Sequence, residues 1–514
     1  MNQFPWLSAL IFTPLFGALL LAGLPSGKAS VARGFVRGFA GLSLAQAAGL
    51  WFSFAPAGGL QWVERHAWIP SLGVDYFLGV DGLGILLVAL AAIVVPFGLL
   101  AWEPPAENAK IYYALFLALE SGLFGSFTAL NFFHWFIFWE LSLIPAFFLI
   151  KLWGGTQRTR AATQFFVYTL AGSVAMLLAF QVIFLATGTF DFIRLAEMGR
   201  SGALTTALTT RLGAGEIAAQ HLPALVFLGV FLGLAVKVPL GPFHAWLPPA
   251  YAEAPPGVSM VLTGVMSKMG VYGFLRILLP LFPGQLREWQ TPLLCLAVGT
   301  IVFSAWTAMA QRDLKRLLAY SSINHLGYCL LGIFAVVNAT GVGATEHRAA
   351  VLDGVILQMF NHGLSASALF CFAGWLERRS GGWRGRDDFG GLRKFMPVFT
   401  GLMGIALFSS LGLPGLNGFI GEFLIFKGVM ALAGWSAALA ALGLLFTAIF
   451  LLTLIQRVFS GPLNEKWTGL PDLTRGERWT VAPIIALMFV IGVYPQCVLG
   501  VINPTVVAWV AQLP

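Results

Sequence analysis

The sequence predicts an all-α polytopic membrane protein, and three observations support this fold class. Hydrophobic residues make up 58% of the 514 residues and charged residues only 10%, whereas a soluble domain usually carries about a quarter charged residues. The mean hydropathy is +0.82. Finally, apolar runs that are long enough to cross a bilayer, which takes roughly 20 residues, recur along the whole chain.

About fourteen of these runs are predicted to be transmembrane helices. The first lacks a basic segment before its apolar core, so it is interpreted as a helix and not as a cleaved signal. A polar stretch at 191–220 separates the sixth run from the seventh. The predicted spans are 4–24, 32–55, 77–102, 111–130, 132–152, 162–187, 222–247, 256–283, 291–310, 316–339, 350–376, 397–427, 431–458 and 479–502.

Basic residues orient the predicted bundle. An even number of spans places both chain ends on one side of the membrane. Loops after odd-numbered spans contain twenty Lys and Arg residues, and the opposite loops contain six. Because cytoplasmic loops carry the excess of Lys and Arg, both termini are predicted to be periplasmic in a bacterial inner membrane.

Two of the predicted spans are interrupted in the same way. Span seven contains the run Val236–Pro242, and span twelve contains Gly412–Gly418; each combines Pro and Gly inside an apolar helix. The segments 164–173 and 358–367 are also identical at four of ten positions. Because the breaks lie five spans apart, an odd number, the two halves are predicted to be inverted repeats, as in transporters with paired broken helices.

These features predict four regions. Residues 1–110 form an N-terminal three-helix region, 111–283 the first inverted repeat and first half-channel, 284–458 the second repeat and half-channel, and 459–514 a C-terminal helix.

Ionisable residues inside the predicted spans are the candidate functional groups, because a charge in the bilayer is expensive and is retained for a reason. Arg276 and Lys427 lie toward span ends and are expected to reach the interface, His134 is interpreted as interfacial, and Glu120 faces either the interior or a partner chain. The remaining candidates for a proton relay are Glu140, Lys237, Lys268, His325, His362 and Glu422.

These groups suit proton transfer. Desolvation favours the neutral forms of Lys and Glu, whereas a nearby opposite charge favours their ionised forms. Moving the partner away therefore changes both protonation states. The alternatives are a structural ion pair between Glu140 and Lys237, and histidines that only make helix contacts.

Five stretches resemble the antiporter-like proton-pumping subunits of bacterial NADH–quinone oxidoreductase (respiratory complex I). The Glu at position 422 is similar to the M-type subunits of this family, because the L-type and N-type subunits usually have a Lys at that position. The resemblance implies that Glu140 and Lys237 are the coupling pair of the first half-channel and that Lys268 is the central relay lysine. It also implies that His325 and His362 continue the proton route and that Glu422 is the terminal group of the second half-channel. It also implies L-type and N-type subunits on either side. The stretches are Tyr76–Gly82, Phe138–Pro145, Val236–Pro248, Leu318–Gly327 and Leu413–Phe423.

The chain departs from the family pattern at one place, and its sequence lacks the motifs of several cofactors and ligands. The family usually has an Asp and a His where this chain has Pro249 and Tyr251, which favours a divergent branch, such as a ferredoxin-, hydrogenase- or carbon-uptake-linked complex. No nucleotide, flavin, haem or metal motif is present, the four cysteines are isolated, and no cofactor, direct NADH binding or nucleic acid is expected. The alternatives are a subunit of a multisubunit cation/proton antiporter and a membrane scaffold.

Overall fold

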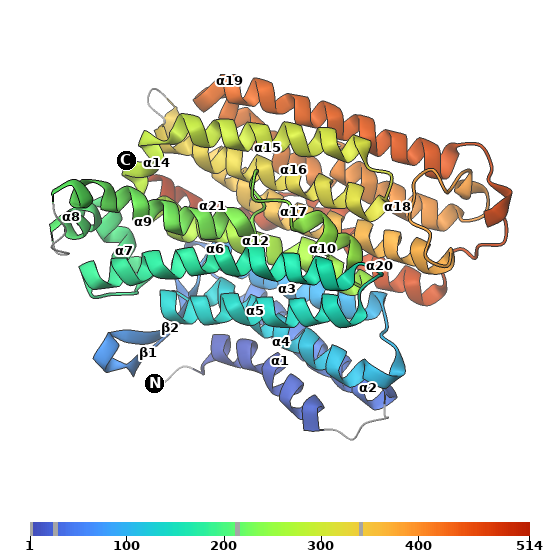
Figure 1. Cartoon of the computed structure of the whole chain (residues 1–514), viewed down its shortest axis with the longest axis horizontal. Coiled ribbons are helices and arrows are strands. Elements are labelled where there is room, and N and C mark those ends of the chain that lie inside the picture. The colour runs from blue at the N-terminus through green and yellow to red at the C-terminus, as the bar shows by residue number, and fades with distance from the viewer. Residues whose placement is uncertain (1–3, 24–28, 211–215, 339–342, 514) are drawn as a thin grey trace.

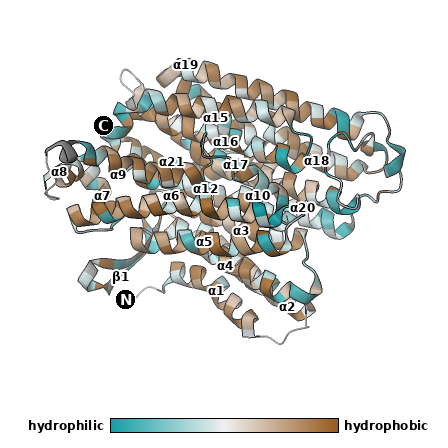
Figure 2. Ribbon diagram, in the orientation of Figure 1, coloured by the Kyte–Doolittle hydropathy of each residue, from teal (hydrophilic) through white to brown (hydrophobic). Residues whose placement is uncertain are grey.

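The computed structural model describes residues 4–23, 29–210, 216–338 and 343–513 as a mostly helical bundle whose long helices run side by side (Figure 1). Eleven of its helices are long and apolar enough to cross a membrane, counting only the described residues. Both chain ends lie at the same end of the bundle, which we call the terminal end. The opposite end, which carries the loop 380–396, is called the basic end. Hydropathy colouring shows apolar helices through most of the bundle and hydrophilic residues gathered at the basic end (Figure 2).

The first half of the chain begins with two helices and a hairpin. Asp81, Asn131 and Asp191 each cap the helix that follows, through side-chain acceptors for backbone N–H groups. The elements are α1 Trp6–Gly23, α2 Ala29–Ser53, β1 Gln61–Ile69, β2 Val74–Val80, α3 Gly82–Ala101, α4 Ala109–Thr128, α5 Phe132–Trp153, α6 Arg158–Thr187, α7 Phe192–Arg200, α8 Ala203–Thr210, α9 Glu216–Lys237, α10 Leu247–Glu253, α11 Pro256–Val261, α12 Ser267–Gly273, α13 Leu279–Leu281 and α14 Pro283–Glu288.

Two π-helical turns, Leu262–Met266 and Phe274–Leu278, connect α11, α12 and α13 into one long segment that is entirely buried over its apolar window. The second half consists of α15 Gln290–Ala310, α16 Leu314–Ala335, α17 Ala344–Arg379, α18 Pro397–Ser410, α19 Asn417–Leu454, α20 Arg475–Val493 and α21 Gln496–Val510, with a π turn at Ile455–Ser460.

The β1–β2 hairpin corrects the expectation of a purely helical chain. Its strands pair antiparallel at the terminal end of the bundle. Glu64 of β1 is buried and accepts a hydrogen bond from the backbone N–H of Leu7, at 2.8 Å, in the first turn of α1. A carboxylate that accepts the free N–H groups of a helix start stabilises it. Strand β1 is too polar to be predicted as a span, and residues 77–80 of β2 continue the apolar run that follows, so they fall within the predicted span 77–102.

Both predicted helix breaks are confirmed. Helix α9 ends at Lys237, the chain leaves helical conformation over 238–246, and α10 resumes at Leu247. Trp246 Nε1 donates to the Val236 carbonyl at 2.9 Å, which satisfies one of the carbonyls that the break frees. The second break lies between Ser410 and Asn417, where the Ser409 hydroxyl donates to Asn417 Oδ1 at 2.6 Å.

One span boundary agrees with the sequence prediction and one differs from it. Helix α19 consists of two helices that meet at a kink at Ala433, with φ −151° and ψ 59°, close to the predicted boundary between spans twelve and thirteen. The predicted last span is two helices, α20 and α21, that meet at Tyr494 and Pro495. Gly492 packs against the backbone of Gly415 and Leu416, so this discontinuity lies beside the second break.

Candidate functional site: a buried series of titratable groups

Lys268 lies at the centre of the buried segment, and its side chain has no solvent exposure. Its ammonium donates to the Thr263 carbonyl at 2.6 Å and to the Ser267 hydroxyl at 3.3 Å. Thr263 belongs to the first π turn, and such turns change which backbone carbonyls are free to accept. The third contact is with His362 Nδ1, at 2.7 Å. The π turn therefore holds the lysine in contact with a histidine of α17.

His362 continues the series toward the second break. Its ring centroid lies 5.2 Å from that of His325 on α16. His325 Nδ1 is 2.9 Å from Glu422 Oε1 on α19, and Gln358 Nε2 donates to the same oxygen at 3.2 Å. All of these side chains are buried. Four of the six predicted relay residues, from α12, α17, α16 and α19, thus form one series, which we call the central series.

The second break places Glu422. Asn361 of α17 donates to the Asn417 carbonyl at 2.6 Å, and Asn417 donates back to the Asn361 carbonyl at 3.1 Å. This reciprocal pair of hydrogen bonds fixes the start of α19 against α17 at Asn361, the residue before His362. Glu422 lies five residues after Asn417, at the level of His325. The second break therefore has a fixed position along the bundle axis relative to the central series.

The other two predicted residues lie at the first break and do not touch each other. Lys237 is the last residue of α9, and its buried ammonium lies 4.8 Å from the centre of the Trp139 ring. Neither this ammonium nor Glu140 Oε1 has a hydrogen-bond partner within the described chain. Direct contact between them is not made, and separation by a single water molecule stays a prediction.

Glu120 is a further buried acid on α4. It has no solvent exposure, and neither carboxylate oxygen has a hydrogen-bond partner among the described residues. The sequence left open whether Glu120 faces the interior of the chain or a partner chain, and this burial confirms the interior. Lys427, by contrast, is exposed on α19, and its reach to the interface stays a prediction.

Sequence reasoning missed two sets of ionic contacts. Arg276 was expected to reach the interface, which is wrong: it is 8% exposed and forms an ion pair of 2.6 Å with the buried Asp81. At the basic end, Arg384 binds Glu253 at 3.2 Å and Asp313 at 3.0 Å. Asp81 and Arg276 are 195 positions apart, so no local sequence signal links them.

The central series has the chemistry of a proton relay. An uncompensated lysine at the centre of a bilayer costs about 2.5–3.5 kcal/mol on insertion scales, so a buried amine changes its protonation state readily when its surroundings change. A histidine accepts a proton on one ring nitrogen and donates from the other. A carboxylate at the end of the series accepts a proton. Short contacts between successive groups are the geometric requirement for such transfer.

Comparison with known proteins defines the class. The model of the family described as "NADH:quinone oxidoreductase/Mrp antiporter, TM" matches residues 129–449, more than half of the chain. The chain belongs to this family of antiporter-like membrane proteins. The matched region contains both helix breaks and all six predicted relay residues.

Individual relatives narrow the class. The chain is 36% identical over 543 residues to NADH-quinone oxidoreductase subunit M of Mycobacterium tuberculosis, covering 98% of this chain and 94% of the relative. It is 37% identical over 510 residues to subunit M of Rhodobacter capsulatus, covering 97% and 95%. A chain of respiratory complex I from Thermus thermophilus superposes with a TM-score of 0.83 at 30% identity, covering 99% of this chain and all of that one. A chain of the Mrp complex from Dietzia shares the fold, with a TM-score of 0.81 at 20% identity.

Proposed function

We propose that this chain is a membrane-arm subunit of a proton-translocating NADH–quinone oxidoreductase, and that its buried groups move protons when quinone is reduced elsewhere in the complex. The observation that carries the proposal is the central series. In it Lys268 lies 2.7 Å from His362, the His362 and His325 ring centroids lie 5.2 Å apart, and His325 lies 2.9 Å from Glu422. The relatives named subunit M support the assignment to this complex.

The proposed transfer follows the contacts. A proton on the Lys268 ammonium passes to His362 across 2.7 Å, which leaves a neutral lysine. Reorientation of the two rings, whose centroids lie 5.2 Å apart, passes it to His325, and the last transfer, across 2.9 Å, protonates Glu422. Glu140 and Lys237 act as the switch. Their approach stabilises the ionised forms of both, and their separation favours release of the Lys237 proton.

We propose that the chain has fourteen membrane spans and two inverted five-helix repeats. The first repeat is 111–283 and the second is 284–458, preceded by the N-terminal region 1–110 and followed by the C-terminal helix 459–514. Helix packing supports the repeats. In the first repeat α4 packs on α5, α5 on α6, and α6 on the broken helix α9; in the second α15 packs on α16, α16 on α17, and α17 on α19, which follows the second break. The three shorter apolar helices, α9, α18 and α21, are parts of spans interrupted near their middle.

The proposed setting is a bacterial inner membrane with both termini in the periplasm. This orientation rests on the excess of basic residues in the opposite loops. L-type and N-type subunits would flank the chain, lipid would cover the remaining apolar surface, and electron transfer would take place on other subunits, without a redox centre, cofactor or NADH site in this chain.

Replacing His362 by Gln tests the proposal. Glutamine keeps a buried hydrogen-bonding side chain but takes up no proton, so the central series is interrupted between Lys268 and His325. In reconstituted complex we expect the ratio of protons pumped to electrons transferred to fall by at least about tenfold. The matched control is His134→Gln, because His134 is also a buried span histidine, but it packs on Trp68 and Tyr76 outside the series.

Two results would contradict the proposal. If the assembled His362→Gln complex pumps at the wild-type ratio, the central series does not carry protons. If sodium moves across the membrane without any redox substrate, and this movement is lost in His362→Gln, the chain serves a cation/proton antiporter instead.

A further inference from the structure

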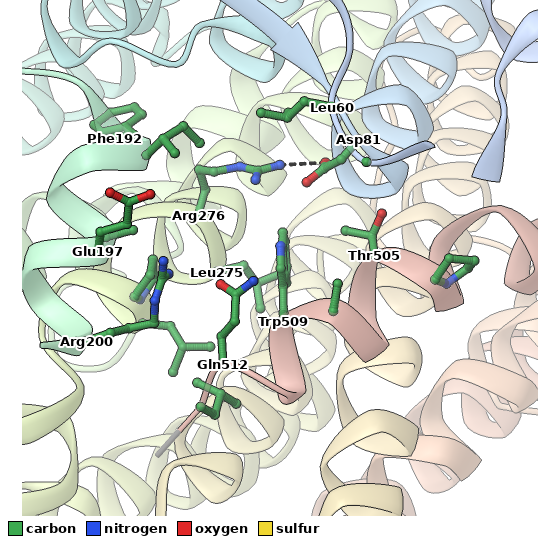
Figure 3. A pocket seen from close by; sticks show the side chains of 18 of the residues that line it. Leu60, Asp81, Phe192, Glu197, Arg200, Leu275, Arg276, Thr505, Trp509 and Gln512 are labelled. Carbon is green, nitrogen blue, oxygen red and sulfur yellow. Dashed lines mark hydrogen bonds and ion pairs between the residues drawn. The ribbon is translucent and has the colours of Figure 1, made fainter. Parts of the chain in front are cut away.

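A cavity of about 380 Å³ opens at the terminal end of the bundle, outside the central series (Figure 3). It lies between α7, the α12–α13 segment and α21, with Leu60 of the loop before β1 beside them. Most of its lining is apolar, and a few polar side chains interrupt it. A concave, mostly apolar cavity of this size with a few placed polar groups is the usual form of a site for a small ligand.

The inner wall of the cavity carries an ion pair that is neutral as a unit. Arg276 Nη2 and Asp81 Oδ1 are 2.6 Å apart, and both side chains are less than a tenth exposed. Arg276 Nε is also buried and has no hydrogen-bond partner within the described chain. Because buried donors in folded proteins are nearly always paired with protein, water or a ligand, the inner wall retains one donor for a bound acceptor.

The rim of the cavity carries two charges of opposite sign that are not paired. Glu197 and Arg200 both line the cavity from α7, and both are exposed. Side chains three residues apart on a helix are neighbours and commonly form an ion pair. Neither of these two, however, makes an ion pair or a side-chain hydrogen bond with another described residue. The rim therefore presents one unpaired negative and one unpaired positive charge beside an apolar interior.

The position of the cavity indicates the class of ligand. Trp509 lines it from the last turn of α21, at the end of the bundle where both chain ends lie. Trp is enriched at the membrane–water interface, at the level of the lipid headgroups. Ala508 also lines the cavity and is exposed, so the cavity is open to the outside of the bundle. Membrane lipid is therefore the ligand available at this depth.

We infer that this cavity binds the headgroup of a zwitterionic phospholipid with a primary amine, the chemistry of phosphatidylethanolamine. The ammonium of the headgroup donates to the Glu197 carboxylate, and the phosphate accepts from the Arg200 guanidinium. An ester carbonyl of the glycerol backbone accepts from Arg276 at the inner wall. The site is separate from the central series and involves no proton transfer.

The two unpaired charges also discriminate against other headgroups. Phosphatidylglycerol has a phosphate but no cation, so it leaves Glu197 as an unpaired negative charge beside a second one. Phosphatidylcholine has a cation, but its methylated nitrogen has no N–H to donate to the carboxylate. A phosphatidylethanolamine headgroup satisfies both rim charges.

A photoreactive lipid tests the site. The assembled complex is reconstituted into phosphatidylcholine vesicles that contain a small fraction of phosphatidylethanolamine with a diazirine at the glycerol end of one acyl chain. After irradiation, mass spectrometry identifies the labelled residues, which we expect among the lining residues of α7 and α21. Unlabelled phosphatidylethanolamine should compete for this labelling, whereas phosphatidylglycerol and soluble inorganic phosphate should not.

Two substitutions and a control separate specific binding from lost structure. Arg200→Gln should reduce the labelling by roughly tenfold, the loss expected for one charge-assisted hydrogen bond. The matched control is Arg194→Gln, because Arg194 is exposed on the same helix but does not line the cavity. Glu197→Lys leaves two unpaired cations at the rim, so phosphatidylglycerol should then compete better than phosphatidylethanolamine. A site that had merely unfolded would show no such reversal.

Three results would overturn the inference. The first is wild-type complex without label on the lining residues, as when a neighbouring subunit fills the cavity. The second is equal labelling of Arg200→Gln and Arg194→Gln. The third is competition by phosphatidylglycerol or by phosphate that equals the competition by phosphatidylethanolamine in the wild type.

Discussion

Lys268→Arg is expected to assemble into the complex and yet to lose at least about nine tenths of its proton pumping, with electron transfer slowed by the coupling. An arginine retains the positive charge that the Thr263 carbonyl and His362 surround, but it cannot be neutral for part of the cycle. A relay through this position requires such a neutral state. The measurement is the ratio of protons pumped to electrons transferred in reconstituted vesicles.

The matched control for this substitution is Lys427→Arg. Lys427 is exposed on α19 and outside the central series, so its replacement should leave the ratio unchanged. If the assembled Lys268→Arg complex pumps at the wild-type ratio, protonation of this side chain is not part of the mechanism.

Gly418→Ala is expected to prevent stable assembly of the subunit. A Cβ atom at Gly418 would collide with the backbone carbonyl of Ser409 on the opposite side of the second break. This carbonyl belongs to a helix end and cannot rotate away as a flexible side chain would. Overpacking usually costs about 1–3 kcal/mol, and occasionally more. The measurements are the amount of subunit in the purified complex and the midpoint of its thermal unfolding.

Gly404→Ala provides the comparison. Gly404 lies in α18, just before the same break, and a Cβ atom there meets nothing within 4 Å. Because Ala favours a helix by about 1 kcal/mol relative to Gly, this variant should be as stable as the wild type or slightly more stable. Equal unfolding midpoints for Gly418→Ala and Gly404→Ala would show that the close approach across the break is not required.

Some features of this protein were determined by the sequence alone. The low content of charged residues predicted a helical membrane protein, because backbone groups in lipid must be satisfied within each span. Pro239 and Pro414 predicted the two breaks, because proline removes a helical hydrogen bond wherever it occurs. The identity of the buried titratable residues was also evident, since an ionisable group within an apolar run needs no partner to be noticed.

The tertiary structure decided which of these groups meet. A run of apolar residues fixes the approximate depth of a side chain in the membrane but neither the direction in which it points nor the helix it faces. Lys268 and His362 are therefore in contact although 94 positions separate them, whereas Glu140 and Lys237, predicted as a pair, are not in contact.

The partner of Arg276 was likewise decided by packing, because a sequence permits both a side chain that reaches the interface and one that turns inward. The acid that turns it inward, Asp81, belongs to a different region of the chain. Depth in the membrane is a local property that a single helix determines by itself. Contact between charges depends on how several helices rotate against one another, and only the packed bundle fixes that rotation.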